Sequence, residues 1–153
     1  MTATMNERSD SLPTATPAVG ARPIDDFLTG HAICVSSGTL LEELAEILEA
    51  NAISGVPVID ELDRVVGVVS RTDLVRQCRS DLPDGQYLRE GLTVGEVMCP
   101  EPVTAVSGEP VGVVARRMVD ERVHRVVVVD EDGLVLGVVS SLDLLNEIPF
   151  PQA

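Results

Sequence analysis

The sequence contains no lysine and no tryptophan, and aromatic residues make up only 2% of its 153 positions. Its 11 basic residues are therefore all arginines, and they stand against 25 acidic residues, which gives a net charge of −14. Without lysine there is no Schiff base, no P-loop lysine and no lysine general base. An acidic chain repels nucleic-acid phosphates and anionic lipid, so we expect neither nucleic acid nor a membrane among its partners.

Cysteine and histidine are too scattered to indicate a metal centre. Cys34, Cys78 and Cys99 form no C-x-x-C pair, and the two histidines form no H-x-x-x-H pattern, which argues against a zinc site. Isolated thiols are typical of a reducing compartment. Uninterrupted apolar runs are no longer than Val126–Val129, and the N-terminus lacks the regions of a signal peptide. We therefore expect a cytoplasmic protein.

What the sequence does contain is an internal duplication. When the chain is aligned with itself at an offset of 70, residues 24–74 match residues 94–144 without a gap, and 14 of 51 positions are identical. The identities include Gly, Ser and Asp, which valine richness alone would not align. We predict a disordered tail over 1–22, a first repeat over 23–80, a linker over 81–92, a second repeat over 93–148 and a C-terminal tail over 149–153.

Each repeat shows the same order of expected elements. A short apolar segment is followed by a helix, then by two valine-rich strands, then by a second helix that starts at Ser70 or Ser140. Thr39 and Glu42 have the spacing of a capping box at the start of the first helix. We predict an α/β fold, β-α-β-β-α twice, with strands over 56–60, 64–69, 125–130 and 134–139. Because each repeat is short and its valine runs favour strands covered on both faces, the two should pack together about a pseudo-twofold axis.

The most specific repeated motif is Gly-Val-Val-Ser-x-x-Asp, at Gly67–Asp73 and again at Gly137–Asp143. In one interpretation the Ser and Asp simply cap a helix, which stabilises it by about 1 kcal/mol. In the other, a helix N-terminus, a hydroxyl and a carboxylate converge where a strand ends. The N–H groups suit a phosphate, and the carboxylate can accept hydrogen bonds from a ribose diol. The two interpretations are compatible.

This duplicated unit resembles the CBS domain pair, or Bateman module, named after cystathionine β-synthase. Besides the repeated motif, the matching segments are the Gly-Val-Pro-Val-Ile-Asp of Gly55–Asp60, the His-Arg-Val-Val-Val-Val-Asp of His124–Asp130 and the Thr-Val-Gly-Glu-Val-Met of Thr93–Met98. The resemblance covers about residues 23–148. It implies a regulatory module, without catalysis of its own, that binds AMP, ADP, ATP or S-adenosylmethionine in clefts between the repeats.

By the same resemblance, the two motif aspartates would hold ribose hydroxyls, the residues around them would lie near ribose and phosphate, and apolar segments of both repeats would enclose the adenine. The candidate ligand contacts are Ile33, Val35, Ile53, Ser54, Gly55, Val56, Pro57, Ser70, Arg71, Thr72, Asp73, Val103, Val123, His124, Arg125, Val126, Ser140, Ser141 and Asp143. No metal and no obligatory cofactor are expected.

The repeats differ where the family often uses His-Arg to meet phosphates. The second repeat has His124-Arg125, whereas the first has Ser54-Gly55, and Thr72 is replaced by Leu142. We therefore expect two clefts that are not equivalent. Asp73, His124 and Cys99 are the only candidates for catalysis, and no pattern in the sequence orients them toward one another.

The resemblance also implies pairing into a flat homodimer and signalling to a protein partner that the sequence does not identify. A second hypothesis remains open, in which the chain is a ligand-independent dimerisation or protein-interaction module. The absence of the His-Arg pair from the first repeat and the plain capping role of Ser-x-x-Asp favour it.

Overall fold

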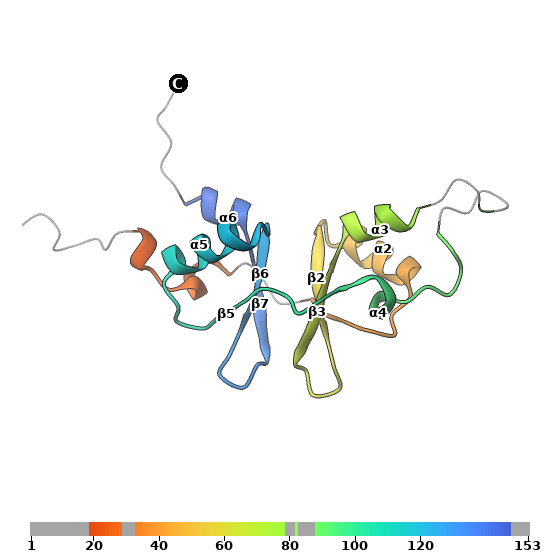
Figure 1. Cartoon of the computed structure of the whole chain (residues 1–153), viewed down its shortest axis with the longest axis horizontal. Coiled ribbons are helices and arrows are strands. Elements are labelled where there is room, and N and C mark those ends of the chain that lie inside the picture. The colour runs from red at the N-terminus through yellow and green to blue at the C-terminus, as the bar shows by residue number, and fades with distance from the viewer. Residues whose placement is uncertain (1–18, 29–32, 79–81, 83–87, 148–153) are drawn as a thin grey trace, which may run out of the picture.

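The computed structural model describes residues 19–28, 33–78, 82 and 88–147. Its elements form two lobes side by side, each with a small sheet and with helices on its outer side (Figure 1). The first lobe contains β1 (Val35–Ser36), α2 (Leu41–Ala50), β2 (Gly55–Ile59), β3 (Val65–Ser70) and α3 (Arg71–Gln77). The second contains β5 (Thr104–Val106), α5 (Val111–Glu121), β6 (Arg125–Val129), β7 (Val135–Ser140) and α6 (Ser141–Leu145). The predicted order β-α-β-β-α is confirmed in both lobes.

The strands pair in the same way in the two lobes. The first strand of each repeat runs parallel to the second, which is antiparallel to the third. Each predicted long strand lies within one residue of the observed strand. The register also repeats, since Gly55 pairs with Ser70 and Arg125 pairs with Ser140. The duplication of the sequence is therefore a duplication of structure.

One predicted helix start is wrong by one residue. The helix α2 begins at Leu41, and the N–H of Leu40 donates to the carboxylate of Glu43 at 3.3 Å. Thr39 instead lies in the preceding turn, where its N–H donates to the carbonyl of Ser36 at 3.2 Å. The spacing of Thr39 and Glu42 is that of a capping box, but the next Glu along the chain makes the contact.

The valine runs form the inner strands, with one departure from expectation. In β6 the side chains of residues 126–129 are all buried, as strands covered on both faces require. In β3 burial alternates, and Val66 and Val68 are only half-buried. The equivalent Val138 on β7 lines a cleft between the lobes. The third strand of each repeat thus packs one face against its own core. The residues on its other face are only partly buried.

The segment that precedes each repeat packs on the opposite lobe. The short helix η3 (Ile24–Phe27) buries Ile24 and Phe27 in the second core, and α4 (Val94–Val97) buries Val94 in the first. Isolated bridges at equivalent positions hold both segments, Pro23 to Pro110 and Leu40 to Thr93. After α4, β4 (Cys99–Pro100) joins the edge of the first sheet beside β3. In Figure 1 the red-orange segment that contains η3 accordingly lies with α5, and green α4 lies with α2 and α3.

This exchange changes two of the predicted boundaries. Most of the tail expected over 1–22 lies outside the described residues, as does the tail over 149–153. Val19–Ala21, however, form a short 3-10 helix, η2, and the carbonyl of Arg22 accepts from the N–H of Val111 at 2.7 Å. Leu92, at the end of the predicted linker, is buried in the first core. The last residues of both segments therefore belong to the folded part.

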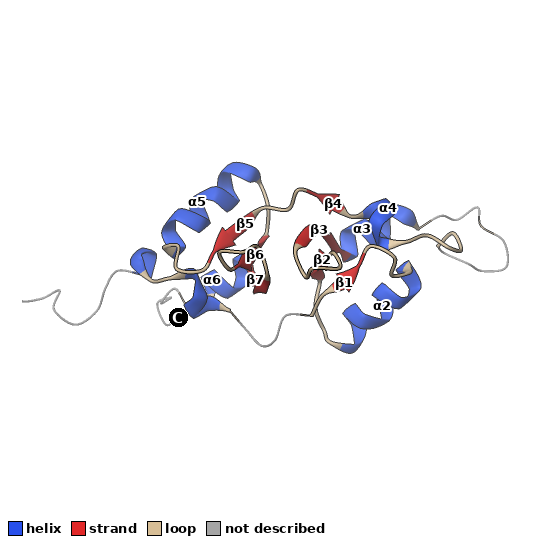
Figure 2. Ribbon diagram, turned by 90° about the horizontal axis from the view of Figure 1, so that it is seen from below, coloured by secondary structure: helices blue, strands red, loops and turns tan. Residues whose placement is uncertain are grey.

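The two hairpins face each other at the centre of the molecule. Figures 1 and 2 show β2–β3 and β6–β7 side by side between the two sets of helices, as the predicted pseudo-twofold arrangement requires. Arg64 and Leu134, in the turns of the two hairpins, form an isolated antiparallel bridge across the axis. The ends of β3 and β7, which carry the repeated motif, point toward the helices.

Candidate functional site

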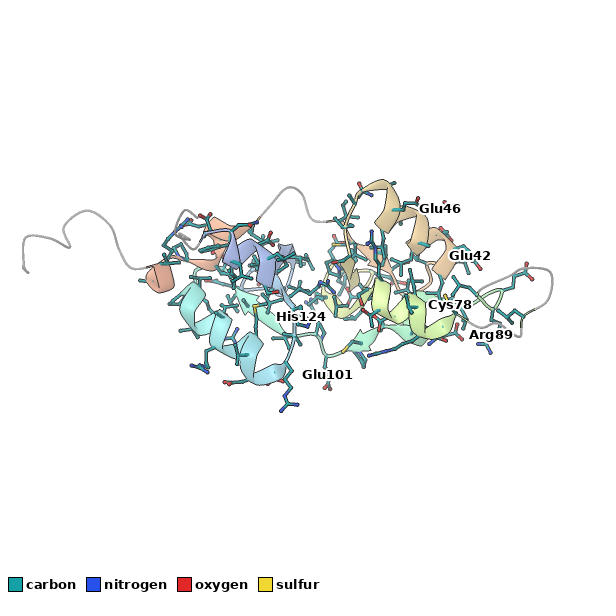
Figure 3. The ribbon with its side chains drawn as sticks, turned by 90° about the horizontal axis from the view of Figure 1, so that it is seen from above. Glu42, Glu46, Cys78, Arg89, Glu101 and His124 are labelled. Atoms are coloured by element: carbon teal, nitrogen blue, oxygen red, sulfur yellow. The ribbon has the colours of Figure 1, made fainter. Side chains whose placement is uncertain are left out.

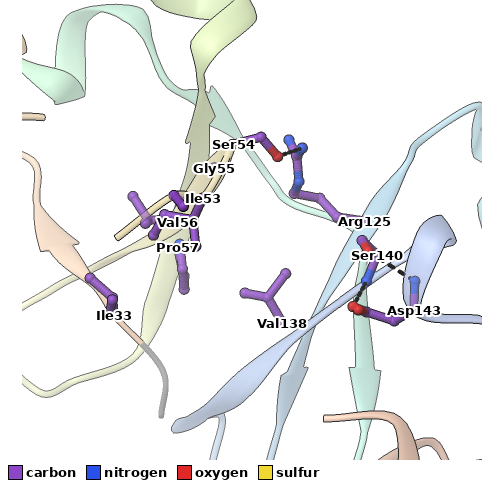
Figure 4. Close-up of a pocket in the computed structure, with 11 residues that line it drawn as sticks. Ile33, Ile53, Ser54, Gly55, Val56, Pro57, Arg125, Val138, Ser140 and Asp143 are labelled. Carbon is purple, nitrogen blue, oxygen red and sulfur yellow. Dashed lines mark hydrogen bonds between the residues drawn. The ribbon is translucent and has the colours of Figure 1, made fainter. Parts of the chain in front are cut away.

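A cleft of about 280 Å³ lies between the two hairpins, just below the ~300–1,000 Å³ that small-molecule sites occupy. One wall comes from the first repeat and the other from the second (Figure 4). The lining residues are Ile33, Ala52, Ile53, Ser54, Gly55, Val56, Pro57, Arg125, Val138, Ser140 and Asp143. Strands that lie far apart in the sequence thus build one site.

The wall from the first repeat is the connection from α2 to β2. The helix ends at Ala50, Ala52 adopts a left-handed φ of 52°, and the N–H of Ile53 returns to the carbonyl of Leu48 at 3.0 Å. The chain then enters β2, where Pro57 presents its ring to the cleft (Figure 4). This wall is mainly apolar and suits the face of a flat ring.

The wall from the second repeat ends in a helix cap. The N–H of Ser140 donates to Oδ2 of Asp143 at 2.7 Å, and the N–H of Asp143 donates to the Ser140 hydroxyl at 3.2 Å. The aspartate half of this cap recurs in the first repeat, where the N–H of Ser70 donates to Oδ2 of Asp73 at 2.8 Å and the Ser70 hydroxyl donates to the same oxygen at 3.3 Å. The capping interpretation of the motif is therefore confirmed. Within the described part of the chain, Oδ1 of Asp143 accepts no hydrogen bond, which leaves an acceptor at the cleft.

Arg125 is the cation of the cleft. It begins β6, and its Nη2 crosses to the first repeat to donate to the hydroxyl of Ser54 at 2.6 Å (Figure 4). Burial lowers the pKa of Arg125, and the nearby carboxylate of Asp73 partly opposes this. An arginine stays charged under such conditions. The guanidinium retains donors beyond the one that Ser54 accepts, because it carries five N–H groups in all.

Acidic residues on the outer helix α2 lie away from this cleft. Glu42 and Glu46 project from the outer side of α2, far from the central hairpins (Figure 3). Screening acts over about 8 Å at cellular ionic strength, so exposed acids on an outer helix have little influence at the centre. The net charge of −14 is therefore compatible with an anion next to Arg125.

The cleft brings together about half of the residues that the sequence indicated. These are Ile33, Ile53, Ser54, Gly55, Val56, Pro57, Arg125, Ser140 and Asp143. They combine the apolar segment of the first repeat with the aspartate of the second, a pairing that the sequence left open.

The other predicted residues lie elsewhere. The side chains of Val35 and Val126 are buried in the two cores, and Val103 packs against the second. An apolar groove between α5 and α6 is bordered by Val123, His124 and Ser141. The residues Ser70, Arg71, Thr72 and Asp73 form the cap and first turn of α3, at the positions that correspond to Ser140–Asp143.

Two residues that line the cleft, Ala52 and Val138, were not among the candidates from the sequence. Val138 lies two positions before Ser140 on β7, and alternate residues of a strand point to the same face, so the pattern contained a signal for it. Ala52 offers no such signal, because its place depends on the left-handed turn after α2.

In the part of the chain that the structure describes, no hydrogen bond joins the three candidate catalytic residues. Asp73 caps α3, and His124 is exposed on the second lobe (Figure 3). Cys99 is exposed on β4, and its thiol donates to the adjacent carbonyl of Pro100 at 3.5 Å. Over the described ranges, no three His, Cys, Asp or Glu residues cluster as metal ligands would, and no helix has the length and apolarity to cross a membrane.

Comparison with protein families identifies the repeats. The model of the CBS domain matches residues 24–80 and again residues 94–149. The chain belongs to the CBS domain family. Both CBS repeats contain a complete β-α-β-β-α unit, and the cleft described above lies between them.

Solved CBS domain pairs share this architecture. The CBS domain pair of protein MJ0100, in complex with 5′-methylthioadenosine and S-adenosyl-L-methionine, is 28% identical, with a TM-score of 0.70 over 82% of this chain and 94% of that one. CBSX2 from Arabidopsis thaliana, in complex with AMP, is 28% identical, with a TM-score of 0.68 over 81% and 93% of the two chains.

A curated relative is the 5′-AMP-activated protein kinase subunit gamma-3 of Sus scrofa, which is 33% identical over 148 residues. That match covers 90% of this chain but 28% of the relative. An uncharacterised protein of Methanocaldococcus jannaschii is 29% identical, and 46% of its length is covered. The chain thus spans less than half the length of the curated relatives that it matches.

Proposed function

We propose that the chain is a regulatory module that binds an adenosine nucleotide, AMP, ADP, ATP or S-adenosylmethionine, in the cleft between its CBS repeats. The observation that carries this proposal is the convergence of three kinds of group on one cleft. An apolar wall, a carboxylate and an arginine are contributed by different repeats (Figure 4).

Each kind of group matches one part of a nucleotide. Ile53 and Pro57 offer apolar surface to a base, and Oδ1 of Asp143 is an acceptor for a ribose diol. Arg125 offers further N–H donors to a phosphate or carboxylate, as charge-assisted hydrogen bonds favour. Related CBS pairs have been solved with AMP, 5′-methylthioadenosine and S-adenosylmethionine, which supports the same ligand class here.

We propose no catalytic activity for the module. Inosine-5′-monophosphate dehydrogenase of Nitrosopumilus maritimus is also a relative, but the match covers only 23% of that enzyme. The ligand would act by favouring one arrangement of the two repeats, since a ligand shifts an equilibrium only through its different affinity for two states. A protein partner would read that arrangement. Cys34, Cys78 and Cys99 are free thiols, which suits the cytoplasmic location that we propose.

Isothermal titration of the chain with AMP, ADP, Mg·ATP and S-adenosylmethionine tests the proposal. At least one ligand should bind, and Asp143→Asn should weaken it by about tenfold to 150-fold, equivalent to ~1.5–3 kcal/mol, because a charge-assisted hydrogen bond is lost. The asparagine keeps an oxygen that can accept from the N–H of Ser140, so the helix cap is largely preserved.

Asp130→Asn is the matched control. Oδ1 of Asp130 accepts from the N–H groups of Asp132 and Leu134 in the β6–β7 turn, and Asp130 does not line the cleft. Its substitution removes the same charge and should leave affinity within about twofold. If both variants bind as the unchanged chain does, Asp143 is not a ribose contact, and if no ligand binds, the nucleotide proposal fails.

A second candidate function is a homodimeric interaction module. The repeats expose an apolar side chain at equivalent positions, Val75 on α3 and Leu145 on α6, which are 68% and 45% exposed. Both helices lie along the same edge of the molecule (Figure 1). Exposed apolar groups gathered on one edge favour an interface with another protein surface.

Analytical ultracentrifugation without ligand tests this second function. A dimer mass that the double variant Val75→Ser/Leu145→Ser reduces to a monomer would support it. The control is Leu62→Ser, which alters a residue that is 64% exposed in the β2–β3 turn, at the other end of the hairpin. A monomer at all concentrations would rule out the homodimer.

A further inference from the structure

The first strand of each repeat is the outer edge of its sheet, β1 in the first lobe and β5 in the second (Figure 2). In the second sheet the N–H of Val127 donates to the carbonyl of Val103 at 3.1 Å, and the N–H of Ser107 donates to the carbonyl of Val129 at 2.9 Å. The alternate positions 104 and 106 therefore direct their peptide groups away from β6. The register of β1 on β2 is the same, so positions 34 and 36 direct theirs away from β2.

Side chains close this outer edge in the second repeat. Nη1 of Arg117 donates to the carbonyl of Thr104 at 2.8 Å. The N–H of Val106 donates to Oε2 of Glu109 at 2.7 Å. Arg117 and Glu109 also form an ion pair with each other. Because the outward carbonyl and the outward N–H are both bonded, the edge of β5 offers little to an additional strand.

The first repeat lacks this closing pair. Ile47 and Thr39 occupy the positions where the second repeat has its arginine and its glutamate. Isoleucine has no donor, and the hydroxyl of Thr39 lies 3.3 Å from the hydroxyl of Ser36. Among the described residues, no side chain bonds to the carbonyl of Cys34 or to the N–H of Ser36. Ser36 is exposed, so the outer edge of β1 is open.

A hollow of about 720 Å³ adjoins this open edge. Cys34 and Ser36 line it together with the turn after β2, which contributes Asp60, Glu61 and Leu62. Asp60 is held in place because its Oδ1 accepts from the N–H of Leu62 at 2.8 Å. Leu62 is 64% exposed, and no basic side chain is among the described residues that line the hollow. The surface thus combines open peptide groups, an apolar side chain and two carboxylates.

We propose that the outer edge of β1 binds an extended basic segment of a partner protein, which adds a strand to the first sheet. Open peptide groups at a sheet edge pair with an extended chain, and the side chains beside the edge give specificity. Basic side chains of the segment would face Asp60 and Glu61, and an apolar one would pack on Leu62. The inference goes beyond the nucleotide proposal and does not rest on it, because neither Ser36 nor Asp60 lines the nucleotide cleft.

The charges favour a basic partner over other occupants of this edge. A second copy of the chain would bring the same carboxylates to the same place, and like charges repel. Residues 1–18 of the chain itself contain one arginine against two acids, so they lack the basic excess that the hollow favours.

Hydrogen exchange measured by NMR with a synthetic peptide tests the proposal. The probe is an end-capped peptide of alternating valine and arginine, and the comparison peptide has glutamate in place of arginine. With the arginine peptide bound, the N–H of Ser36 should exchange about tenfold more slowly or more, because it gains a hydrogen bond. The N–H of Val106 is the internal control and should not change, since it already donates to Glu109.

Binding measured by titration tests the charges. The glutamate peptide should bind about fivefold to tenfold more weakly than the arginine peptide at low salt, and added salt should reduce the difference. Asp60→Asn/Glu61→Gln should remove this preference, while the asparagine keeps an oxygen for the N–H of Leu62. Asp130→Asn/Glu131→Gln, at the equivalent positions of the second repeat, is the matched control and should leave the preference unchanged.

A transfer of the closing pair tests the edge itself. Thr39→Glu/Ile47→Arg should close β1 as β5 is closed, and the arginine peptide should no longer slow exchange at Ser36. If this variant does not fold, an arginine peptide N-methylated along its backbone gives the same test on the unchanged chain. It keeps the charge but cannot pair as a strand, so it should not slow exchange at Ser36.

The proposal has clear contrary results. An unchanged exchange rate at Ser36 in the presence of the arginine peptide, or equal slowing at Val106, would overturn strand addition at β1. Equal affinity for the two peptides would overturn the choice of a basic partner. Each of these results leaves the nucleotide function in place, because titration with nucleotides measures that function separately.

Discussion

Ile24 belongs to the first repeat by sequence and to the second lobe by packing, and Ile24→Ala tests which assignment governs stability. Its side chain is fully buried in the second core with Val111, Val114 and Val139. Its N–H donates to the carbonyl of Glu109 at 2.8 Å, which fixes the segment against the start of α5. Removing the side chain should therefore weaken the second lobe and not the first.

The expected cost follows from the size of the deletion. Ile→Ala removes three carbon atoms, worth about 0.8 kcal/mol each on transfer from water, and the cavity that remains adds to this. Because Ile24 is 0% exposed, the full term applies, and we expect a loss of about 3–4 kcal/mol in the free energy of unfolding. That is a large part of the ~5–15 kcal/mol that stabilises an ordinary domain.

Urea unfolding measures the loss, and hydrogen exchange locates it. Amide protection should fall first in β6 and β7, because regions of a protein open separately according to their local stability. Val94→Ala is the matched variant, since Val94 is the equivalent position, is also 0% exposed and lies in the first core. It should cost about 2 kcal/mol and should lower protection in β2 and β3.

The opposite pattern would refute the exchange of segments. If Ile24→Ala lowered protection in β2 and β3 while β6 and β7 kept theirs, the segment would pack on its own repeat. A loss below about 1 kcal/mol would show that Ile24 is not buried as described, because replacing a fully buried isoleucine with alanine typically costs about 2–5 kcal/mol.

Two further predictions concern the same exchanged segments. Gly67→Ala should lower the free energy of unfolding by about 1–3 kcal/mol, and by more than Gly137→Ala does. A Cβ at position 67 would lie 2.9 Å from the backbone carbonyl of Cys99, whereas at position 137 the close atom is Cδ2 of the flexible Leu28 side chain. Equal losses in urea unfolding would contradict this. The pKa of Asp25 is lowered mainly by the hydrogen bond from the Ser107 hydroxyl and next by the one from the N–H of Gly108. Its carboxylate therefore stabilises the fold fully at pH values above its unfolded pKa of about 3.9. This contribution is lost as the pH falls through the lowered pKa of the folded state. The difference in unfolding free energy between the unchanged chain and Asp25→Asn should therefore shrink toward low pH, and a difference independent of pH would count against the interaction.

Local features of the sequence predicted the elements well. The strands are visible because runs such as Val126–Val129 lie between turn residues, and the starts of α3 and α6 are visible because Ser and Asp three residues apart cap a helix. The start of α2 was misplaced because Glu42 and Glu43 are adjacent, and only the backbone geometry selects between them. These signals act over a few residues, which is why a single sequence contains them.

The duplication, the family resemblance and the residues available for a ligand site can all be read from the sequence. Three features appear only in the folded chain: Asp143 meets the apolar wall of the first repeat, the lead-in segments are exchanged, and Arg125 crosses to Ser54. They could not be predicted because the two repeats have interchangeable apolar patterns. Ile24 and Val94 would fit either core by pattern, and only the packing of distant segments against each other selects one partner.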